Sequence, residues 1–301
     1  MKLNKKNIFS ALSLITLLSA CGGGGGSSND SDSTKVSTGN SQTGETKTCL
    51  GFSLTNSSQC IETSDRKAYL LKVGEPKGLA ILLHGSPGSP KKISNIFGAN
   101  LLSSDFGFTT LILKGSDPTW GWNSTVSEGN QINDEVSYIS ELIDSVIADN
   151  NIPSDKVIVM GYSAGGFMAY KLACQIPEKL AGIISIAGQL RGSVNYCTNS
   201  TPVAVHHMHN PQDTEVPVMG GRGITSLNDT LEHFMSVNGC SGQVNEESVA
   251  GVTSNDLKAT EVSYLDCEHS LKYTKLHNIP HESSYEAEKI LQQLQYMIGQ
   301  E

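Results

Sequence analysis

The sequence predicts an α/β fold in which a mostly parallel central sheet is covered by helices on both faces. Short apolar runs typical of buried strands alternate along the chain with segments whose apolar residues recur at helical spacing. The clearest stretch is the apolar, mostly β-branched run at 157–160, which enters Gly-Tyr-Ser-Ala-Gly-Gly at 161–166 and is followed directly by helical sequence. Because parallel strands are joined by crossover connections that are usually helices, this alternation favours a parallel sheet between two helical layers.

Strands and helices are expected in the following order. Strands are expected at residues 67–73, 79–84, 108–113, 156–160, 180–187, 203–208, 261–265 and 271–276. Helices are expected at residues 93–102, 133–149, 167–175, 223–237 and 283–298. The helix at 133–149 has a regular pattern, since Val136, Ile139 and Ile143 keep helical spacing and Pro153 stands just past its end.

The N-terminus has the features of an export signal. Lys2, Lys5 and Lys6 precede a short apolar run from Ile8 to Leu18, and the segment ends in Leu-Ser-Ala-Cys at 18–21. A run of this length predicts a secretion signal over residues 1–21 and not a membrane-spanning helix. Its ending, Leu-Ser-Ala-Cys, resembles a bacterial lipobox, with an ordinary signal peptide as the alternative. The resemblance implies that Cys21 is lipidated and anchors the protein in the bacterial cell envelope, facing the periplasm or the exterior, and Gly22 favours the outer membrane.

The remaining chain is expected to comprise a tether and one domain. Residues 22–48 consist mainly of Gly, Ser, Asn, Asp and Thr, which cannot bury enough apolar surface to fold. Residues 49–301 have the length of a single α/β domain.

The charge balance argues against binding to nucleic acid. The chain has 21 basic and 30 acidic side chains, and without the three lysines of the signal the balance is 18 against 30, a net charge of −12. No basic run follows the signal. We therefore expect no nucleic-acid partner, and no attachment to a membrane other than through the lipid on Cys21.

The cysteine count indicates disulfide bonds. Six cysteines follow Cys21, and an even number in an exported chain favours disulfides over a metal site. Six cysteines allow fifteen pairings, between which the sequence alone does not choose. No Cys-x-x-Cys pattern indicates a zinc or redox site.

Ser163 is the candidate nucleophile. It stands at the centre of Gly-x-Ser-x-Gly, between a predicted strand and a predicted helix, which is the context of a nucleophile elbow. Gly161 and Gly165 are needed because the sharp turn brings backbones too close for side chains. The turn presents the Ser163 hydroxyl at the N-terminus of a helix, whose dipole favours negative charge.

A serine hydroxyl needs a base to take its proton and an acid to orient that base. In α/β folds with this serine motif the partners follow in the order Ser, Asp or Glu, His. Asp213 follows the strand at 203–208 in a turn-rich loop and is the candidate acid, with Glu215 as its competitor. Asp117 and Asp134 precede the serine, which is the wrong order.

The base is expected on one other loop, and the oxyanion donors are expected at the serine turn itself and on a second loop. His281 follows the last strand and precedes the final helix, so it is the candidate base, with His277 as its competitor. An oxyanion needs preorganised backbone donors. We expect one from the N–H of Ala164 and one from the N–H of Ser86, because the neighbouring Pro87 has none.

Two further groups of residues admit two interpretations. His206, His207 and His209 suggest metal ligands, but only His207 and His209 share a strand face, so packing beside the acid loop is favoured and no metal is expected. Trp120 and Trp122, in the loop after the third strand, either line the substrate pocket or pack the loop.

These motifs together resemble the α/β-hydrolase superfamily, and more narrowly the secreted polyhydroxybutyrate depolymerase and feruloyl esterase group. The resemblance covers residue 69 to the C-terminus and rests on Leu-Leu-His-Gly at 82–85, Gly-Tyr-Ser-Ala-Gly-Gly at 161–166, the strand end at 184–188, His209 to Gly221, and Tyr-Leu-Asp-Cys at 264–267 followed by His281. It implies an α/β-hydrolase fold with Ser163, Asp213 and His281 as the catalytic triad. Glu-Ser-Ser at 282–284 replaces the group's frequent Thr-Trp-Pro, and no room is left for a separate substrate-binding domain, which argues against solid polymers and plant cell-wall esters.

The disulfide pairing follows from the resemblance together with loop length. The group has cysteines near four of the six positions, and pairing of sequence neighbours closes three local loops. The expected pairs are Cys49–Cys60, Cys174–Cys197 and Cys240–Cys267.

The expected activity is that of a serine carboxylic-ester hydrolase that forms an acyl-enzyme and needs no cofactor. Its substrate is expected to be a small-molecule or oligomeric ester of short-chain, hydroxyalkanoate or aromatic type. A serine peptidase or amidase using the same triad, and a non-catalytic binding lipoprotein, are the alternatives. The sequence does not fix the oligomeric state.

Overall fold

The computed structural model describes residues 47–63, 65–117, 119, 121–128 and 132–299. The expected signal with Cys21, nearly all of the expected tether, and Trp120 lie outside these residues. Among the helices that are described, none is both long enough and apolar enough to cross a bilayer.

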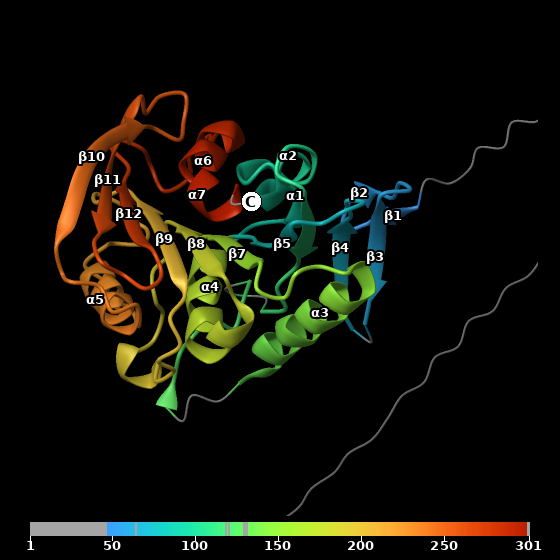
Figure 1. Ribbon diagram of the computed structural model, residues 1–301, viewed down its shortest axis with the longest axis horizontal. Helices are drawn as coiled ribbons and strands as arrows, with labels where there is room; N and C mark the ends of the chain where they lie inside the picture. The colour runs from blue at the N-terminus through green and yellow to red at the C-terminus, as the bar shows by residue number, and fades with distance from the viewer. Residues whose placement is uncertain (1–46, 64, 118, 120, 129–131, 300–301) are drawn as a thin grey trace, which may run out of the picture. The chain divides into compact units, whose positions relative to one another are not determined.

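A ten-stranded sheet forms the centre of the fold (Figure 1). The strands run in the spatial order β10 (Val244–Ala250), β11 (Lys258–Tyr264), β12 (Leu271–Lys275), β9 (Ala204–His209), β8 (Gly182–Ile186), β7 (Val157–Tyr162), β5 (Gly78–Leu83), β6 (Phe108–Leu113), β4 (Lys67–Leu71) and β3 (Ser58–Glu62). Every pairing from β12 to β6 is parallel, and the two outer pairings at each edge are antiparallel. The mostly parallel sheet expected from the sequence is therefore confirmed. A separate pair, β1 (Thr48–Cys49) and β2 (Phe52–Ser53), precedes it.

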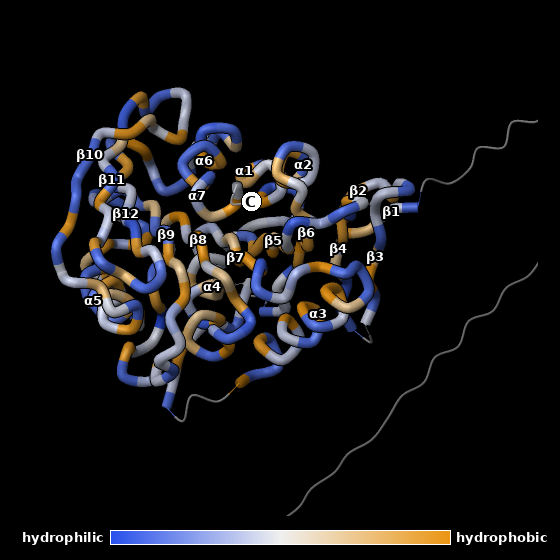
Figure 2. The backbone as a smooth tube through the Cα atoms, viewed as in Figure 1, coloured by the Kyte–Doolittle hydropathy of each residue, from blue (hydrophilic) through white to orange (hydrophobic). Residues whose placement is uncertain are grey.

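Helices cover both faces of the sheet (Figure 1). One face carries α3 (Asp134–Asn150), α4 (Ala164–Gln175) and α5 (Leu227–Val237). The other carries α1 (Pro90–Ile96), α2 (Ala99–Ser104), α6 (Ala287–Gln293) and α7 (Gln295–Ile298). The central strands β5, β6, β7 and β8 are buried along their whole length and are rich in apolar residues (Figure 2). Two apolar cores result, one between each helical layer and the sheet.

The expected strands are present within a few residues. Of the strands that were not expected, β3 and β10 lie at the edges of the large sheet, and β1 and β2 form the separate pair. β10 has the sequence Val-Asn-Glu-Glu-Ser-Val-Ala and is almost entirely exposed, so it has no apolar run to mark it. It pairs with β11 on one side only, and its charged residues are typical of an edge strand.

Two expected helices are divided in the structure, and a third begins late. The helix expected at 93–102 ends at Ile96, and α2 starts after Gly98, which adopts φ 61°. The helix expected at 283–298 begins at Ala287 and is interrupted at Leu294. α5 begins at Leu227 and not at 223, because the Ser226 hydroxyl accepts from the N–H of Asp229 as its N-cap.

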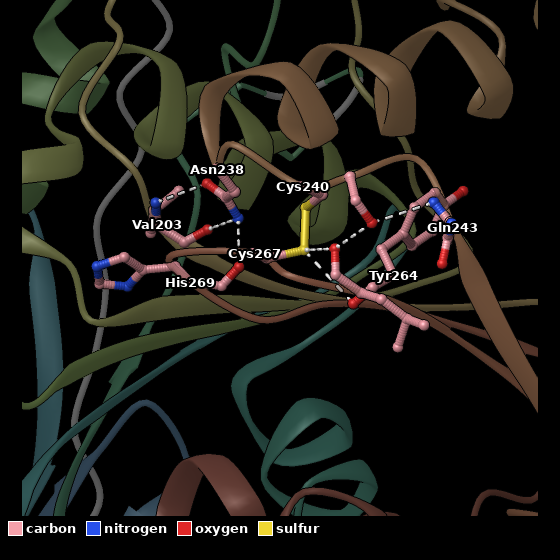
Figure 3. Close-up of a disulfide and its surroundings, with 9 residues drawn as sticks. Val203, Asn238, Cys240, Gln243, Tyr264, Cys267 and His269 are labelled. Atoms are coloured by element: carbon pink, nitrogen blue, oxygen red, sulfur yellow. Dashed lines mark hydrogen bonds between the residues drawn. A yellow bond between two sulfur atoms is a disulfide. The ribbon is translucent and has the colours of Figure 1, made fainter.

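The structure contains disulfides at the three expected pairs, Cys49–Cys60, Cys174–Cys197 and Cys240–Cys267. The third lies next to Asn238 at the end of α5 (Figure 3). The Asn238 side chain donates to the carbonyls of Val203 and His269 and accepts from the N–H of Val203. The disulfide and this amide together fasten α5 to the starts of β9 and β12, and so hold the strands that lead into the acid and histidine loops.

Candidate active site

Ser163 occupies the sharp turn between β7 and α4, at the carboxyl edge of the sheet. Its backbone adopts φ 52°, a conformation that residues with a Cβ rarely adopt. A Cβ on Gly161 would lie 2.1 Å from the carbonyl oxygen of Gly165, and a Cβ on Gly165 would lie 2.0 Å from that of Leu83. The two flanking glycines are therefore dictated by contact between backbones, as the motif predicts.

The side chains of Ser163, His281 and Asp213 form a hydrogen-bonded line. The Ser163 hydroxyl lies 2.9 Å from Nε2 of His281, and Nδ1 of His281 lies 2.6 Å from Oδ2 of Asp213. A carboxylate only accepts, so Nδ1 of His281 carries the proton and Nε2 presents a lone pair to the serine. All three side chains are buried. This arrangement can move a proton from the hydroxyl to the imidazole.

The topology of the sheet brings the three residues together. β9 and β12 are parallel neighbours, so the loops that carry Asp213 and His281 leave the same edge of the sheet side by side. The side-chain amide of Asn210 donates to the carbonyl of Ile279 at 2.6 Å and joins the two loops. The Tyr162 hydroxyl donates to the carbonyl of His281 at 2.9 Å and holds the histidine backbone over the serine turn.

Asp213 is stabilised as a carboxylate. Its Oδ1 accepts from the N–H groups of Glu215 and Val216, at 2.8 and 2.9 Å. Its Oδ2 lies near two imidazoles, those of His281 and His209. Burial raises the pKa of this carboxyl, but the hydrogen bonds from His209, His281 and Val216 outweigh burial and hold its pKa well below the usual range. Asp213 therefore carries a full negative charge at neutral pH.

The competing residues lie elsewhere in the site or outside it. Glu215 is exposed at the wall of the cavity, and its contact with Asp213 is through its backbone. The His277 ring is hydrogen-bonded to Thr260 on β11, 3.0 Å from its hydroxyl. Asp134 is the first residue of α3, and Asp117 accepts from the N–H of Thr119 within its own loop.

A cavity of about 160 Å³ opens over the serine. It is lined by Ser86, Ser163, Ala164, Phe167, Arg191, Glu215, Val216, Arg222, Ile224 and His281. The N–H of Ala164 belongs to the first turn of α4, where backbone donors have no acceptor within the helix. Gly85 lets the loop after β5 approach the turn, since a Cβ there would lie 2.8 Å from the Tyr162 ring and 3.3 Å from Cβ of Ser163. Ser86 and Ala164 thus reach the same cavity from different loops.

Trp122 packs the loop and does not line this cavity. Its side chain is fully buried, and Nε1 donates to the carbonyl of His84 at 2.7 Å. The His84 ring accepts at Nε2 from the N–H of Gly115 and donates from Nδ1 to the carbonyl of Gly85. Trp122 therefore packs the loop, as the second of the two interpretations has it. The indole and His84 together support the segment that carries Ser86.

The three histidines of β9 divide between the two faces of the strand, as its alternation predicts. His206 faces Thr274 and Tyr296, while His207 and His209 are hydrogen-bonded to each other. Both ring nitrogens of His207 and of His209 are engaged. Across the described part of the chain, no group of three or more His, Cys, Asp or Glu side chains is placed to hold a metal ion.

Several supporting residues were not singled out from the sequence. Tyr162 is the variable residue of Gly-x-Ser, and nothing in the motif indicates that its hydroxyl reaches His281. His84 and Asn210 lie within motifs that carry the resemblance, but the motifs do not show their partners, which are 31 and 69 residues away in the chain. Only the fold brings these residues to their partners.

Comparisons with known proteins show the family and support the fold. Residues 72–254, more than half of the chain, match the phospholipase/carboxylesterase family. Feruloyl esterase D of Neurospora crassa is 29% identical over 140 residues, which are 46% of this chain and 44% of that protein. Feruloyl esterase C of Emericella nidulans is 28% identical over 121 residues, 40% of this chain and 39% of that protein. The chain thus spans less than half of the length of these curated relatives.

A solved structure supports the architecture. The acetyl xylan esterase of Aspergillus awamori superposes with a TM-score of 0.58 over 80% of this chain and 98% of that protein, at 16% sequence identity. At this identity the likeness concerns the fold alone. The family match and the shared architecture lead to one conclusion: the chain belongs to the phospholipase/carboxylesterase family and has the α/β-hydrolase fold.

Proposed function

We propose that the protein is a serine carboxylic-ester hydrolase that works through an acyl-enzyme. The observation that carries this proposal is the hydrogen-bonded line from Ser163 through His281 to Asp213, with the serine at the floor of a cavity. Membership of the phospholipase/carboxylesterase family supports the same chemistry.

In the first half of the reaction Ser163 attacks the ester carbonyl. Nε2 of His281, 2.9 Å from the hydroxyl, takes the proton as the new C–O bond forms. The imidazolium that results is stabilised by Asp213, whose carboxylate lies 2.6 Å from Nδ1. The tetrahedral intermediate collapses as His281 returns the proton to the leaving alcohol, and an acyl-serine remains.

The oxyanion is held by backbone amides. The N–H of Ala164, at the start of α4, and the N–H of Ser86 both belong to residues that line the cavity. Donors of this kind are already oriented before the charge develops, so they stabilise the transition state more than the ground state. In the second half of the reaction water replaces the serine, with His281 again first base and then acid.

The cavity favours small ester groups. Its volume of about 160 Å³ is below the range of about 300–1,000 Å³ typical of drug-sized ligands. Phe167, Val216 and Ile224 provide apolar contact, and two arginines and Glu215 provide polarity. We infer short-chain, hydroxyalkanoate or aromatic esters as substrates, the last in line with the relatives named feruloyl esterases.

Hydrolysis of p-nitrophenyl acetate and butyrate by the full chain, beside Ser163→Ala, tests the proposal. We expect ester turnover that is lost in Ser163→Ala, and a faster rate with acetate. A folded wild type that hydrolyses anilides but not esters would establish the peptidase or amidase alternative. A folded wild type that is inert toward both would leave the fold as a binding scaffold.

We also propose that the domain is tethered to the outer membrane through lipid on Cys21. The support is the sequence of residues 1–48, a signal ending in Leu-Ser-Ala-Cys and then a tether rich in Gly and Ser. Cells fed labelled palmitate should label the wild type and not Cys21→Ser. A wild type without label would contradict the anchor and leave the catalytic proposal untouched.

A further inference from the structure

A second row of buried polar groups starts at Asp213 and runs away from the cavity into the core. Nε2 of His209 lies 3.2 Å from Oδ2 of Asp213 and 3.0 Å from the carbonyl oxygen of Val216. Nδ1 of His209 lies 3.0 Å from Nε2 of His207, and Nδ1 of His207 lies 3.0 Å from the Tyr170 hydroxyl on α4. His207, His209 and Tyr170 have no exposed surface. The mechanism above assigns none of them a role.

With both rings neutral, only one arrangement of hydrogens satisfies every atom in this row. Two acceptors, Oδ2 of Asp213 and the carbonyl of Val216, face Nε2 of His209, so this nitrogen carries the hydrogen. Nδ1 of His209 is then an acceptor, and His207 donates to it from Nε2. Nδ1 of His207 is in turn an acceptor, and the Tyr170 hydroxyl donates to it. Every hydrogen bond in the row points toward Asp213.

The surroundings of Tyr170 and His207 favour this arrangement. Burial raises the pKa of Tyr170, so its hydroxyl stays protonated and can donate. Burial, together with the neighbouring His209 and His206, lowers the pKa of His207 well below its usual value, so its ring is neutral. A neutral ring has one donor and one acceptor nitrogen, as the row requires.

We propose that His209, His207 and Tyr170 are positioning residues that hold the catalytic carboxylate of Asp213 in place by fixing the tautomer of His209. This proposal rests on the proposed function, since it concerns the acid of that triad. Oδ2 of Asp213 is shared between His281 at 2.6 Å and His209 at 3.2 Å. The second donor prevents the oxygen from swinging away from His281. If the His209 tautomer were reversed, a lone pair would face the carboxylate and repel it.

The same strand contains a matched control. His206 is also fully buried, but it faces the opposite core. Its Nε2 lies 2.8 Å from the Thr274 hydroxyl and its Nδ1 lies 3.1 Å from the Tyr296 hydroxyl. His206 and Tyr296 therefore repeat the pairing of His207 and Tyr170 without a connection to Asp213. Substitutions of His206 or Tyr296 therefore measure the effect on activity of disturbing a buried histidine of β9, without changing a hydrogen bond of the row that leads to Asp213.

The test distinguishes the role of Nε2 of His209, which faces Asp213, from that of Nδ1. A glutamine amide reaches the position of Nε2 and keeps a donor toward Asp213, whereas an asparagine amide reaches only the position of Nδ1 and loses it. We expect His209→Asn to lower kcat about tenfold with KM unchanged, because the base is less well oriented. His209→Gln should stay within about threefold of the wild type. Tyr170→Phe, which removes only the last donor of the row, should lower kcat about threefold, while Tyr296→Phe and His206→Asn should leave kcat unchanged.

Each measurement is made on the full chain with p-nitrophenyl acetate, and active sites are counted by the initial burst of p-nitrophenol. Equal kcat values in His209→Asn and His209→Gln would overturn the proposal, and so would an equal loss in His206→Asn. If His209→Asn does not fold, Tyr170→Phe is compared with Tyr296→Phe. Equal kcat values in these two variants would likewise overturn the proposal. A folded wild type without esterase activity would overturn the proposed function as well, whereas an active wild type with an unaffected His209→Asn overturns the positioning role alone.

Discussion

Nδ1 of His281 lies 2.6 Å from Oδ2 of Asp213, although 68 residues separate the two in the chain. The distance is set by the pairing of β9 with β12, which are parallel and in register from Val205 and Leu271 onward. Each loop leaves its strand at the same edge of the sheet, and the Asn210 amide, which donates to the carbonyl of Ile279, joins the two loops there. The geometry of the candidate site is therefore a property of the sheet.

Removing the charge of Asp213 should abolish most of the activity. We expect Asp213→Asn to lower kcat by about 10³–10⁴, because the amide neither stabilises the imidazolium nor fixes the tautomer of His281. Glu215→Gln is the matched control, since Glu215 contacts Asp213 only through its backbone N–H. Steady-state rates with p-nitrophenyl acetate decide the matter. A large loss in Glu215→Gln together with a mild loss in Asp213→Asn would transfer the role of acid to Glu215.

A methyl group on Gly165 should disrupt the serine turn. Its Cβ would lie 2.0 Å from the carbonyl oxygen of Leu83, so β5 or α4 would have to move. We expect Gly165→Ala to destabilise the fold by about 3 kcal/mol and to remove activity. Gly74→Ala serves for comparison, because a Cβ there meets nothing within 4 Å. Urea unfolding measures both variants, and equal stability of the two would show that the turn tolerates a side chain.

The buried histidine of the opposite core should make stability depend on pH. Burial, with a smaller contribution from Lys272, lowers the pKa of His206 to about 3. Between about pH 6.5 and pH 3 the unfolded chain therefore binds a proton at this residue that the folded chain does not. The contribution of His206 to the free energy of unfolding is therefore complete above pH 6.5 and is lost as the pH falls toward 3.

The groups that face His206 are Thr274, Tyr296, Lys272 and Glu261, whose carboxylate is 4.0 Å from Nε2. In His206→Asn we expect the free energy of unfolding to fall less steeply with decreasing pH, by about 1.4 kcal/mol per pH unit. Urea midpoints between pH 4 and 6.5 measure the slope. An unchanged slope in the variant would mean that His206 takes up its proton in the folded protein as readily as in the unfolded one.

Loss of the indole N–H of Trp122 should weaken the loop over the site. Trp122→Phe leaves the carbonyl of His84 without its donor in a buried place, and we expect a loss of about 1–3 kcal/mol in stability. Because the same loop leads to Ser86, kcat should fall more than KM rises. Thermal unfolding and steady-state kinetics test the two expectations separately. A stable variant with a changed KM alone would place Trp122 in substrate binding.

Sequence patterns predicted the proposed catalytic residues better than the residues that support them. The strand, turn and helix around Ser163 are local, and the order of Asp213 and His281 follows from the topology, so both could be inferred from spacing. The break at Gly98 and the polar edge strand β10 were missed, because a left-handed residue and an exposed strand leave little hydrophobic pattern.

The row of His209, His207 and Tyr170 could not be foreseen for a different reason. The sequence shows that His207 and His209 share a strand face, but it does not show what that face meets. Tyr170 lies 37 residues from His207 in the chain and reaches it only because α4 packs on β7 and β8, on the same sheet face on which His207 projects from the neighbouring β9. Such contacts depend on side-chain packing between elements, which no single segment encodes.

The central claim is that Ser163 becomes acylated, and peptide mass spectrometry tests it most directly. The protein is mixed with p-nitrophenyl butyrate, quenched in acid within the burst phase and digested. We predict a butyryl mass increase on the peptide that contains Ser163, and no such increase in Ser163→Ala. An active wild type whose Ser163 peptide never carries the acyl group, or an acyl group found equally in the alanine variant, would contradict the account.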